Sequence, residues 1–203
     1  MAKKGLLLVI SGPSGAGKGT IVHELLQREP GLHLSVSATT RSPRVGEENG
    51  VSYYFVSKPE FEHLVETDGM LEHATYCDNY YGTPIAPIKE MIAEGKNVIL
   101  EIEVQGGMQV MNKMDNAVGI FVLPPSFKEL KNRLVGRNTE SMDKIEKRLL
   151  RAQEEINEID HYDYILINDD LDDAVETFRA ILIGETQRVS RNKKTIKEVC
   201  ETC

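Results

Sequence analysis

The stretch that decides the fold is Gly12-Pro13-Ser14-Gly15-Ala16-Gly17-Lys18-Gly19-Thr20, which directly follows the apolar run at residues 6–10. A glycine, four further residues and then Gly-Lys is the spacing of a loop whose backbone N–H groups converge on phosphate oxygens. Glycines permit the tight turn, a following helix adds positive charge at its N-terminus, and Lys18 would reach the β- and γ-phosphates. Because the loop lies between a predicted strand and a predicted helix, residues 12–20 are expected to bind a nucleoside triphosphate.

One position departs from this pattern. Residue 19 is glycine, where the pattern has a serine or threonine whose hydroxyl binds Mg²⁺. We therefore expect Thr20 to bind a phosphate oxygen. The Mg²⁺ that accompanies the nucleotide would be held in another way, for instance through water by Glu101 or Glu103.

Four apolar runs of strand length set the fold class: residues 6–10, 98–102, 118–123 and 164–167. They are continuous rather than alternating, as in strands that are buried on both faces. Helical patterns separate them, at residues 20–27, 85–93 and 126–134. This alternation predicts an α/β protein in three layers, α/β/α, with a parallel sheet at its core.

Two segments interrupt the alternation. Residues 33–83 are rich in serine, threonine and tyrosine, with short strand-like pieces at 34–37 and 53–56 and a capped helix at 59–66. Residues 137–160 carry apolar side chains every three or four positions, which predicts one amphipathic helix. The expected organisation is one domain with four parts: a core of residues 1–35, 85–126 and 159–190, an inserted mixed α/β lobe at 36–84, a helical lid at 127–158 and a basic, frayed tail at 191–203.

The charge balance excludes some classes of partner. The 203 residues include 24 Lys and Arg against 32 Asp and Glu, a net charge of −8, so a general nucleic-acid binder is not expected. No apolar run has the length of a signal peptide core or of a membrane helix, and a cytoplasmic location is the expectation. Cys200 and Cys203 have metal-ligand spacing, but they stand alone at the end of the chain and are interpreted as part of the tail.

A second anion site is indicated at residues 37–44. Arg41 and Arg44 are three positions apart in a loop that Pro43 stiffens, and two guanidinium groups can hold one phosphate. Tyr53 and Tyr81 could add hydroxyl donors. On these residues alone a surface feature is an equal alternative. With the phosphate loop, and without the Asn-Lys-x-Asp motif of a switch GTPase, a kinase for a phosphorylated small molecule is the favoured interpretation.

The same residues carry a family resemblance. The run Ser37-x-Thr39-Thr40-Arg41-x-Pro43-Arg44-x-Gly46-Glu47 resembles the nucleotide-monophosphate lobe of bacterial-type guanylate kinases, which belong to the P-loop nucleoside monophosphate kinases. The match continues in order to about residue 180: Gly50-x-x-Tyr53-x-Phe55, Glu72, Tyr80-Tyr81-Gly82-Thr83, Glu101-Ile102-Glu103-x-Gln105-Gly106, Pro124-Pro125-Ser126, Arg133-x-x-x-Arg137-x-Thr139-Glu140, Arg148 and Asn168-Asp169-Asp170. The chain departs from the family at Gly19, often serine, and at Glu103, often aspartate.

The resemblance implies transfer of phosphate from ATP, with Mg²⁺, to GMP and dGMP, in purine nucleotide metabolism and GMP recycling. It implies that ATP is bound by residues 12–20, Arg133 and Asn168, the last near the adenine. It implies that GMP is bound by Ser37, Arg41, Arg44, Tyr53, Glu72, Tyr81, Thr83 and Glu103. Lys18, Arg41, Arg137 and Arg148 are the implied catalytic residues, the last two on the lid.

The implied role of Glu72 is chemically sensible. Guanine presents donors at N1–H and at its 2-amino group, and one carboxylate can accept from both, whereas adenine does not offer this pair. Two alternatives stay open: a related P-loop kinase for a phosphorylated sugar such as a ribose bisphosphate, and a catalytically inactive guanylate-kinase-like module that binds a phosphopeptide. Glu72 and Tyr81 speak against the first, and the intact phosphate loop against the second. The oligomeric state is left open.

Overall fold

The computed structural model describes residues 4–136 and 141–201, and its centre is a five-stranded parallel sheet. The strand order is β2-β7-β1-β8-β9. The bounds are Leu32–Leu34 for β2, Asn97–Glu101 for β7, Leu7–Ser11 for β1, Ala117–Leu123 for β8 and Tyr164–Ile167 for β9. Every residue of β1 is buried, because the strand has a neighbour on each side and helices above and below. The continuous apolar runs therefore predicted β1, β7, β8 and β9 correctly, but the expected burial on both faces is wrong for β9, an edge strand in which only Leu166 is buried.

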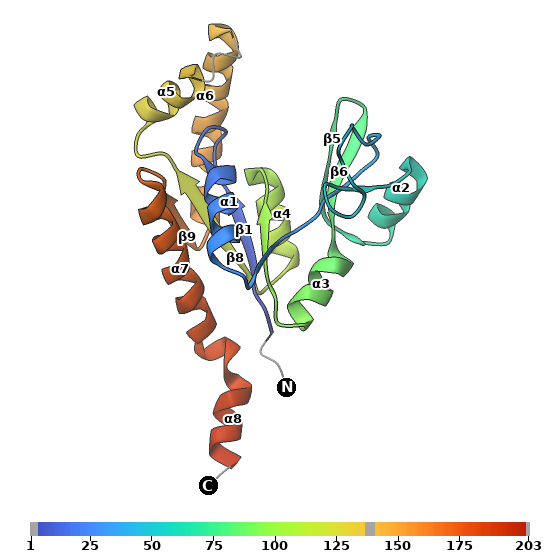
Figure 1. The fold of residues 1–203 in the computed structure, drawn as a ribbon, viewed down its shortest axis with the longest axis vertical. Coiled ribbons are helices and arrows are strands. Elements are labelled where there is room, and N and C mark those ends of the chain that lie inside the picture. Colours follow the sequence, from blue (N-terminus) through green and yellow to red (C-terminus); the bar gives the residue numbers. More distant parts are fainter. Residues whose placement is uncertain (1–3, 137–140, 202–203) are drawn as a thin grey trace.

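Helices cover both faces of this sheet, which confirms the three-layer architecture (Figure 1). On one face, α1 (Lys18–Arg28) and α7 (Leu171–Gln187) bury apolar side chains against Leu8 and Ile10. On the other, α3 (Ile85–Ala93) and α4 (Val104–Lys113) pack against Leu7 and Val9. Alternate residues of β1 thus serve the two halves of the core.

Helix α4 was not predicted from the sequence. Its first turns contain Gly106 and Gly107, which are poor helix formers. The structure explains Gly107, since a Cβ there would lie 2.6 Å from Oγ of Ser11 and 2.5 Å from the hydroxyl of Tyr162. Close approach of the helix to the end of β1 requires glycine at this position.

A second sheet of four strands lies to one side of the core, as Figure 1 shows. Its order is β4 (Tyr54–Phe55), β3 (Ala38–Thr39), β6 (Asn79–Pro84) and β5 (Met70–Tyr76), and α2 (Lys58–Glu66) packs on it. We call these five elements the small lobe. The predicted capping box of α2 is present, with Ser57 and Glu60 bonded reciprocally.

The strand predicted at residues 34–37 is wrong. Leu34 ends β2 in the central sheet, and Ala38 begins β3 in the small lobe. Residues 35–37 instead connect the two sheets, so Ser37 lies at the crossing between the core and the small lobe.

Two further helices form a hairpin at the phosphate-loop end of the core: α5 (Phe127–Gly136) and α6 (Met142–Ile156) (Figure 1). Leu130 and Leu134 of α5 pack against Ile145 and Ala152 of α6, so the middle of the predicted apolar stripe faces the partner helix. The prediction of one helix up to residue 160 is wrong, because α6 ends at Ile156. After α6, the short helix η1 (Ile159–His161) leads into β9. None of the helices in the described part of the chain is both long enough and apolar enough to cross a membrane.

The prediction of a frayed tail is wrong for residues 193–201. They form α8 (Lys193–Glu201), which follows the short helix η2 (Val189–Arg191) and extends away from the core in Figure 1. The Asn192 side chain donates to the carbonyls of Thr186 and Arg188, 2.9 Å from each. These bonds link the residue before α8 to the C-terminal end of α7. Cys203 lies outside the described residues, and Cys200 is an exposed free thiol.

Candidate functional site

The phosphate loop, residues 12–20, connects β1 to α1 in the predicted context. Gly12, Gly15 and Gly17 have φ values of +145°, +96° and +94°, which favour glycine. A side chain at Gly12 would also collide with the carbonyl of Val122 in the neighbouring strand β8. Lys18 folds back along the loop, where its ammonium donates to the carbonyl of Gly12 at 2.6 Å and to that of Pro13 at 3.2 Å.

Two predicted nucleotide-binding residues, Asn168 and Arg133, form hydrogen bonds to the backbone of the phosphate loop. The buried Asn168, which follows β9, donates from Nδ2 to the carbonyl of Ala16 at 2.8 Å. Arg133 of α5 donates to the same carbonyl at 3.4 Å and to the carbonyl of Asn168 at 2.9 Å. These contacts fix the loop backbone between β9 and α5. The adenine contact of Asn168 stays a prediction.

A hollow of about 250 Å³ opens in front of the loop. It is lined by Gly12, Ser14, Lys18, Glu103, Arg148, Arg151 and Glu155. Three α6 side chains therefore line the same hollow as Lys18, and the catalytic role of Arg148 stays a prediction. The predicted catalytic residue Arg137 lies outside the described residues.

Glu101 lies beside the position that departs from the loop pattern. A Cβ on Gly19 would lie 3.5 Å from Oε1 of Glu101, so the carboxylate faces the first turn of α1. Desolvation raises the pKa of Glu101, and the charge of Lys18 opposes this rise. Carboxylate oxygens suit Mg²⁺, which is usually held by one or two carboxylates, phosphates and several waters. No group of three or more acidic, His or Cys ligands occurs among the residues that the structure describes.

The residues of the predicted second anion site gather around Arg41 in the small lobe. Its guanidinium donates to both carboxylate oxygens of Glu47, at 2.9 and 3.0 Å, and lies 5.5 Å from the ring centre of Tyr53. The Tyr53 ring in turn contacts that of Tyr81, 6.2 Å away between centres. Hydrogen bonds from Arg41 lower the pKa of Glu47, so this carboxylate holds the arginine in place.

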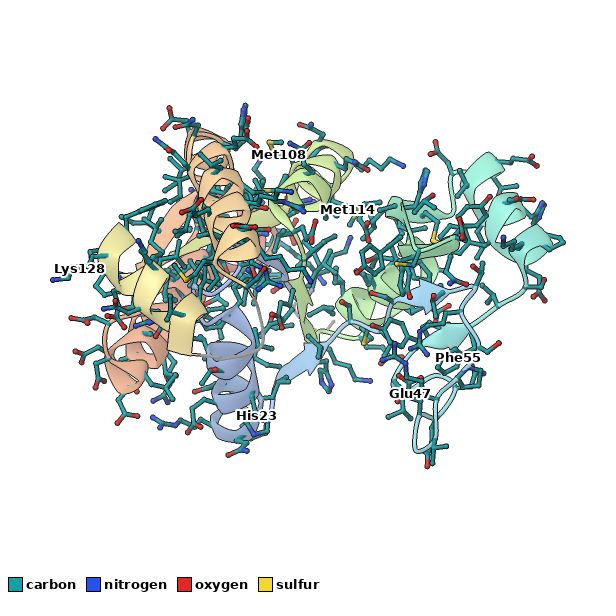
Figure 2. The ribbon with its side chains drawn as sticks, turned by 90° about the horizontal axis from the view of Figure 1, so that it is seen from above. His23, Glu47, Phe55, Met108, Met114 and Lys128 are labelled. Atoms are coloured by element: carbon teal, nitrogen blue, oxygen red, sulfur yellow. The ribbon has the colours of Figure 1, made fainter. Side chains whose placement is uncertain are left out.

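Arg44 is only partly drawn into this group. Its backbone N–H donates to Oε2 of Glu47 at 2.7 Å, while the residue is exposed. Figure 2 shows Glu47 on the small-lobe side together with Phe55, whose ring lies 5.9 Å from the Arg41 guanidinium. Glu47 belongs to a motif that the sequence shows, but its role of holding Arg41 was not predicted.

A buried carboxylate lies deeper in the small lobe. Glu72 of β5 accepts a 2.6 Å hydrogen bond from the hydroxyl of Thr83 in β6, and both side chains are buried. Burial raises the pKa of Glu72, and the bond from Thr83 opposes this rise. A Cβ on Gly106 would lie 3.5 Å from Oε2 of Glu72, so the start of α4 lies next to this carboxylate. Glu72 and Thr83, each predicted separately to bind GMP, therefore lie together, and their direct hydrogen bond was not predicted.

Glu103, expected beside Glu72, instead turns towards α6. Its Oε2 accepts from the guanidinium of Arg151 at 2.7 Å, and Nε of Arg151 donates to Glu155 at 3.0 Å. Burial raises the pKa of Glu155, and Arg151 opposes this rise. Sequence reasoning missed Arg151 and Glu155. The available signal was their helical spacing: Arg151 is three positions after Arg148, and Glu155 is four after Arg151, which places all three on one side of α6.

Comparison with known proteins gives a consistent result. The family model described as guanylate kinase matches residues 4–185. A guanylate kinase of Caldanaerobacter subterraneus subsp. tengcongensis is 51% identical over 199 residues, 98% of this chain and 97% of the relative. One of Clostridioides difficile is 53% identical over 196 residues, 97% of this chain and 96% of the relative. The crystal structure of guanylate kinase from Anaplasma phagocytophilum is similar with a TM-score of 0.71 and 32% identity, covering 94% of this chain and 91% of that one.

Proposed function

Since the chain belongs to the guanylate kinase family, we propose that it transfers the γ-phosphoryl group of ATP to GMP, forming ADP and GDP. The single observation that supports this most directly is the buried Glu72, held by Thr83 in a lobe that also carries Arg41. A buried carboxylate rejects bases that leave it unpaired, because its hydrogen-bonding capacity then goes unused. Guanine supplies two adjacent donors for it.

The small lobe binds the acceptor. Arg41, with Tyr53 and Tyr81 beside it, faces the acceptor phosphate, and the bond to Glu47 orients the guanidinium for this contact. Ser37 lies at the hinge between the sheets, where its hydroxyl can reach the base. Residues 36–84 thus contact both the base and the phosphate of GMP. Arg44, which is exposed, adds positive charge.

The phosphate loop and the α5–α6 hairpin carry out the transfer. Backbone N–H groups of the loop and Lys18 hold the β- and γ-phosphates of ATP. Arg148, which faces the same hollow, neutralises the charge that develops on the transferred group, and the resemblance assigns Arg137 the same task. Closure of residues 127–158 as a lid excludes water and limits ATP hydrolysis.

Mg²⁺ accompanies ATP in this proposal. Glu101 would hold it through water at the first turn of α1, in the space that Gly19 leaves. When bound, Mg²⁺ neutralises phosphate charge and fixes the geometry of the triphosphate. The purine nucleotide pool and the cytoplasm are the corresponding setting.

The test is ADP release from MgATP with GMP, dGMP, AMP, CMP, a ribose bisphosphate or no acceptor, in parallel. We expect strong release with GMP and dGMP and little with the other additions. A Lys18→Ala variant, purified identically, controls for contaminating kinases and should be inactive. Release with the ribose bisphosphate alone would indicate a sugar-phosphate kinase. Absence of release with every acceptor, together with binding of a phosphopeptide, would indicate an inactive binding module.

A further inference from the structure

An ion pair joins the lid helix to the acceptor side of the core. Glu103 immediately precedes α4, and its Oε2 lies 2.7 Å from the guanidinium of Arg151 on α6, 48 residues away in the chain. Arg151 also bonds Glu155 at 3.0 Å. All three side chains line the hollow that contains Lys18.

Glu103 occupies a position from which it can serve two partners. Gly106, one helical turn further along α4, borders Glu72, with 3.5 Å between a Cβ at Gly106 and Oε2 of Glu72. Glu103 therefore lines the phosphate hollow and lies three residues before the glycine that borders Glu72, around which the guanine pocket is proposed. In this structure the Glu103 carboxylate is bound to α6 and not to the pocket.

We propose that Arg151 is a positioning residue of the acceptor site. It holds the Glu103 carboxylate on α6 until the guanine of GMP replaces Arg151 as the partner of Glu103. The proposal rests on the proposed function, in which Glu103 belongs to the guanine pocket. GMP must then break the Glu103–Arg151 ion pair, which removes this one contact between α6 and the residue before α4.

The exchange is energetically modest. The side chains of Glu103 and Arg151 are 75% and 59% exposed, so water screens their attraction. After Glu103 has left, Arg151 is still paired with Glu155, so the charge of Arg151 keeps a partner. An exposed pair of this kind corresponds to about a 2- to 5-fold change in an equilibrium constant.

The test is a calorimetric double-mutant cycle for GMP binding without ATP, at low ionic strength. We expect Arg151→Ala to bind GMP about 2- to 5-fold more tightly than the wild type, because the competitor for Glu103 is removed. In a Glu103→Gln background, Arg151→Ala should leave the GMP affinity unchanged. Raising the salt concentration should shrink the difference between the wild type and Arg151→Ala.

The control is Arg179→Ala, which removes the same charge from an arginine on α7 that pairs with Glu29 and Glu176. It should leave the GMP affinity at the wild-type value, and thermal unfolding checks that each variant is folded. Weaker or unchanged GMP binding by Arg151→Ala would overturn the proposal. If Glu103→Gln bound GMP as the wild type does, the inference would fail at Glu103, while kinase activity with GMP would still stand as a separate result.

Discussion

The hydroxyl of Thr83 donates a 2.6 Å hydrogen bond to Oε1 of Glu72, and both side chains are buried between adjacent strands of the small lobe. The bond fixes one carboxylate oxygen and leaves Oε2 facing the start of α4. Burial raises the pKa of this carboxyl group, so the charged form is held at a cost in folding free energy. Such a cost is typical of a group retained for binding.

The first prediction is that Glu72→Gln impairs the use of GMP without destabilising the fold. The amide has the same shape, and its oxygen still accepts from Thr83, so the melting temperature should stay equal or rise. The amide nitrogen is a donor and opposes the donors of guanine, so kcat/KM for GMP should fall about 10²- to 10⁴-fold. Steady-state kinetics and thermal unfolding measure the two effects. Glu66→Gln, at an exposed acid of α2, is the matched control and should change neither.

The second prediction concerns pH. Because burial raises the pKa of Glu72 above the ordinary 4.5, its carboxylate is protonated at a higher pH than an exposed one. GMP affinity should therefore fall as pH decreases through this raised pKa. The GMP phosphate also titrates, near pH 6, and Glu72→Gln retains that titration. The wild-type and Glu72→Gln binding profiles, measured by calorimetry, should converge on acidification, and parallel profiles would contradict the role of Glu72.

The third prediction separates transfer from acceptor binding. Arg148 faces the phosphate loop across the hollow and lies away from the small lobe. Arg148→Ala should lower kcat by about 10²-fold or more, as for other arginines that neutralise a transferring phosphoryl group. The dissociation constant for GMP alone should change little. A large loss of GMP affinity with unchanged kcat would place Arg148 in the acceptor site. Arg179→Ala, far from the hollow, serves as the control here as well.

Strands β1, β7 and β8 were predictable because burial on both sides leaves a continuous apolar run in each of them. Helix α4 was not, since close approach to Ser11 selects Gly107 against the helical preference of the sequence. Strand β5 also gave little signal, because only its first three residues are buried. Local patterns therefore identified the elements that bury a whole strand or a helix face.

The candidate site was predictable to a different extent. The phosphate loop was predicted from its local motif spacing alone. Glu72 and Thr83 come from two strands; the family resemblance gave each residue separately, and nothing in the sequence indicated the bond between them. The Glu103–Arg151 ion pair joins residues 48 positions apart on the surface, and no periodicity marks such a contact in advance.

The fourth prediction tests the arrangement at Gly19. A Cβ there would lie in ordinary contact with Glu101, 3.5 Å from Oε1, so Gly19→Ser should be accommodated without disturbing α1. Glu101→Gln should weaken MgATP binding about 3- to 30-fold while changing the affinity for ATP in EDTA little. Gly19→Ser in that background should recover part of the loss, because its hydroxyl supplies a direct ligand. Calorimetric titration of ATP with and without Mg²⁺ measures this. An equal loss with and without Mg²⁺ would exclude Glu101 from the metal site.

The fifth prediction concerns stability at the base of α7. The carboxylate of Glu185 is 1% exposed and accepts from the hydroxyl of Tyr164 at 2.6 Å and from Arg191 at 2.9 Å. Burial opposes the charged form, but these hydrogen bonds outweigh it and lower the pKa of Glu185 below 4.5. A lowered pKa means that its contribution is present above the unfolded-state pKa and is lost as pH falls through the folded-state value. Glu185→Gln should therefore cost about 1–3 kcal/mol of unfolding free energy at neutral pH.

Urea unfolding of wild type and Glu185→Gln, repeated from pH 7 to below pH 4, provides the measurement. The difference between the two should be constant at neutral pH and shrink on acidification, since the wild-type carboxylate then becomes protonated. Glu201→Gln removes an acid that pairs with Lys197 on the exposed surface of α8, and it should change stability by less than about 0.5 kcal/mol. A difference that grew as pH fell would mean that Glu185 is protonated in the native state, and that Arg191 and Tyr164 hold a neutral group.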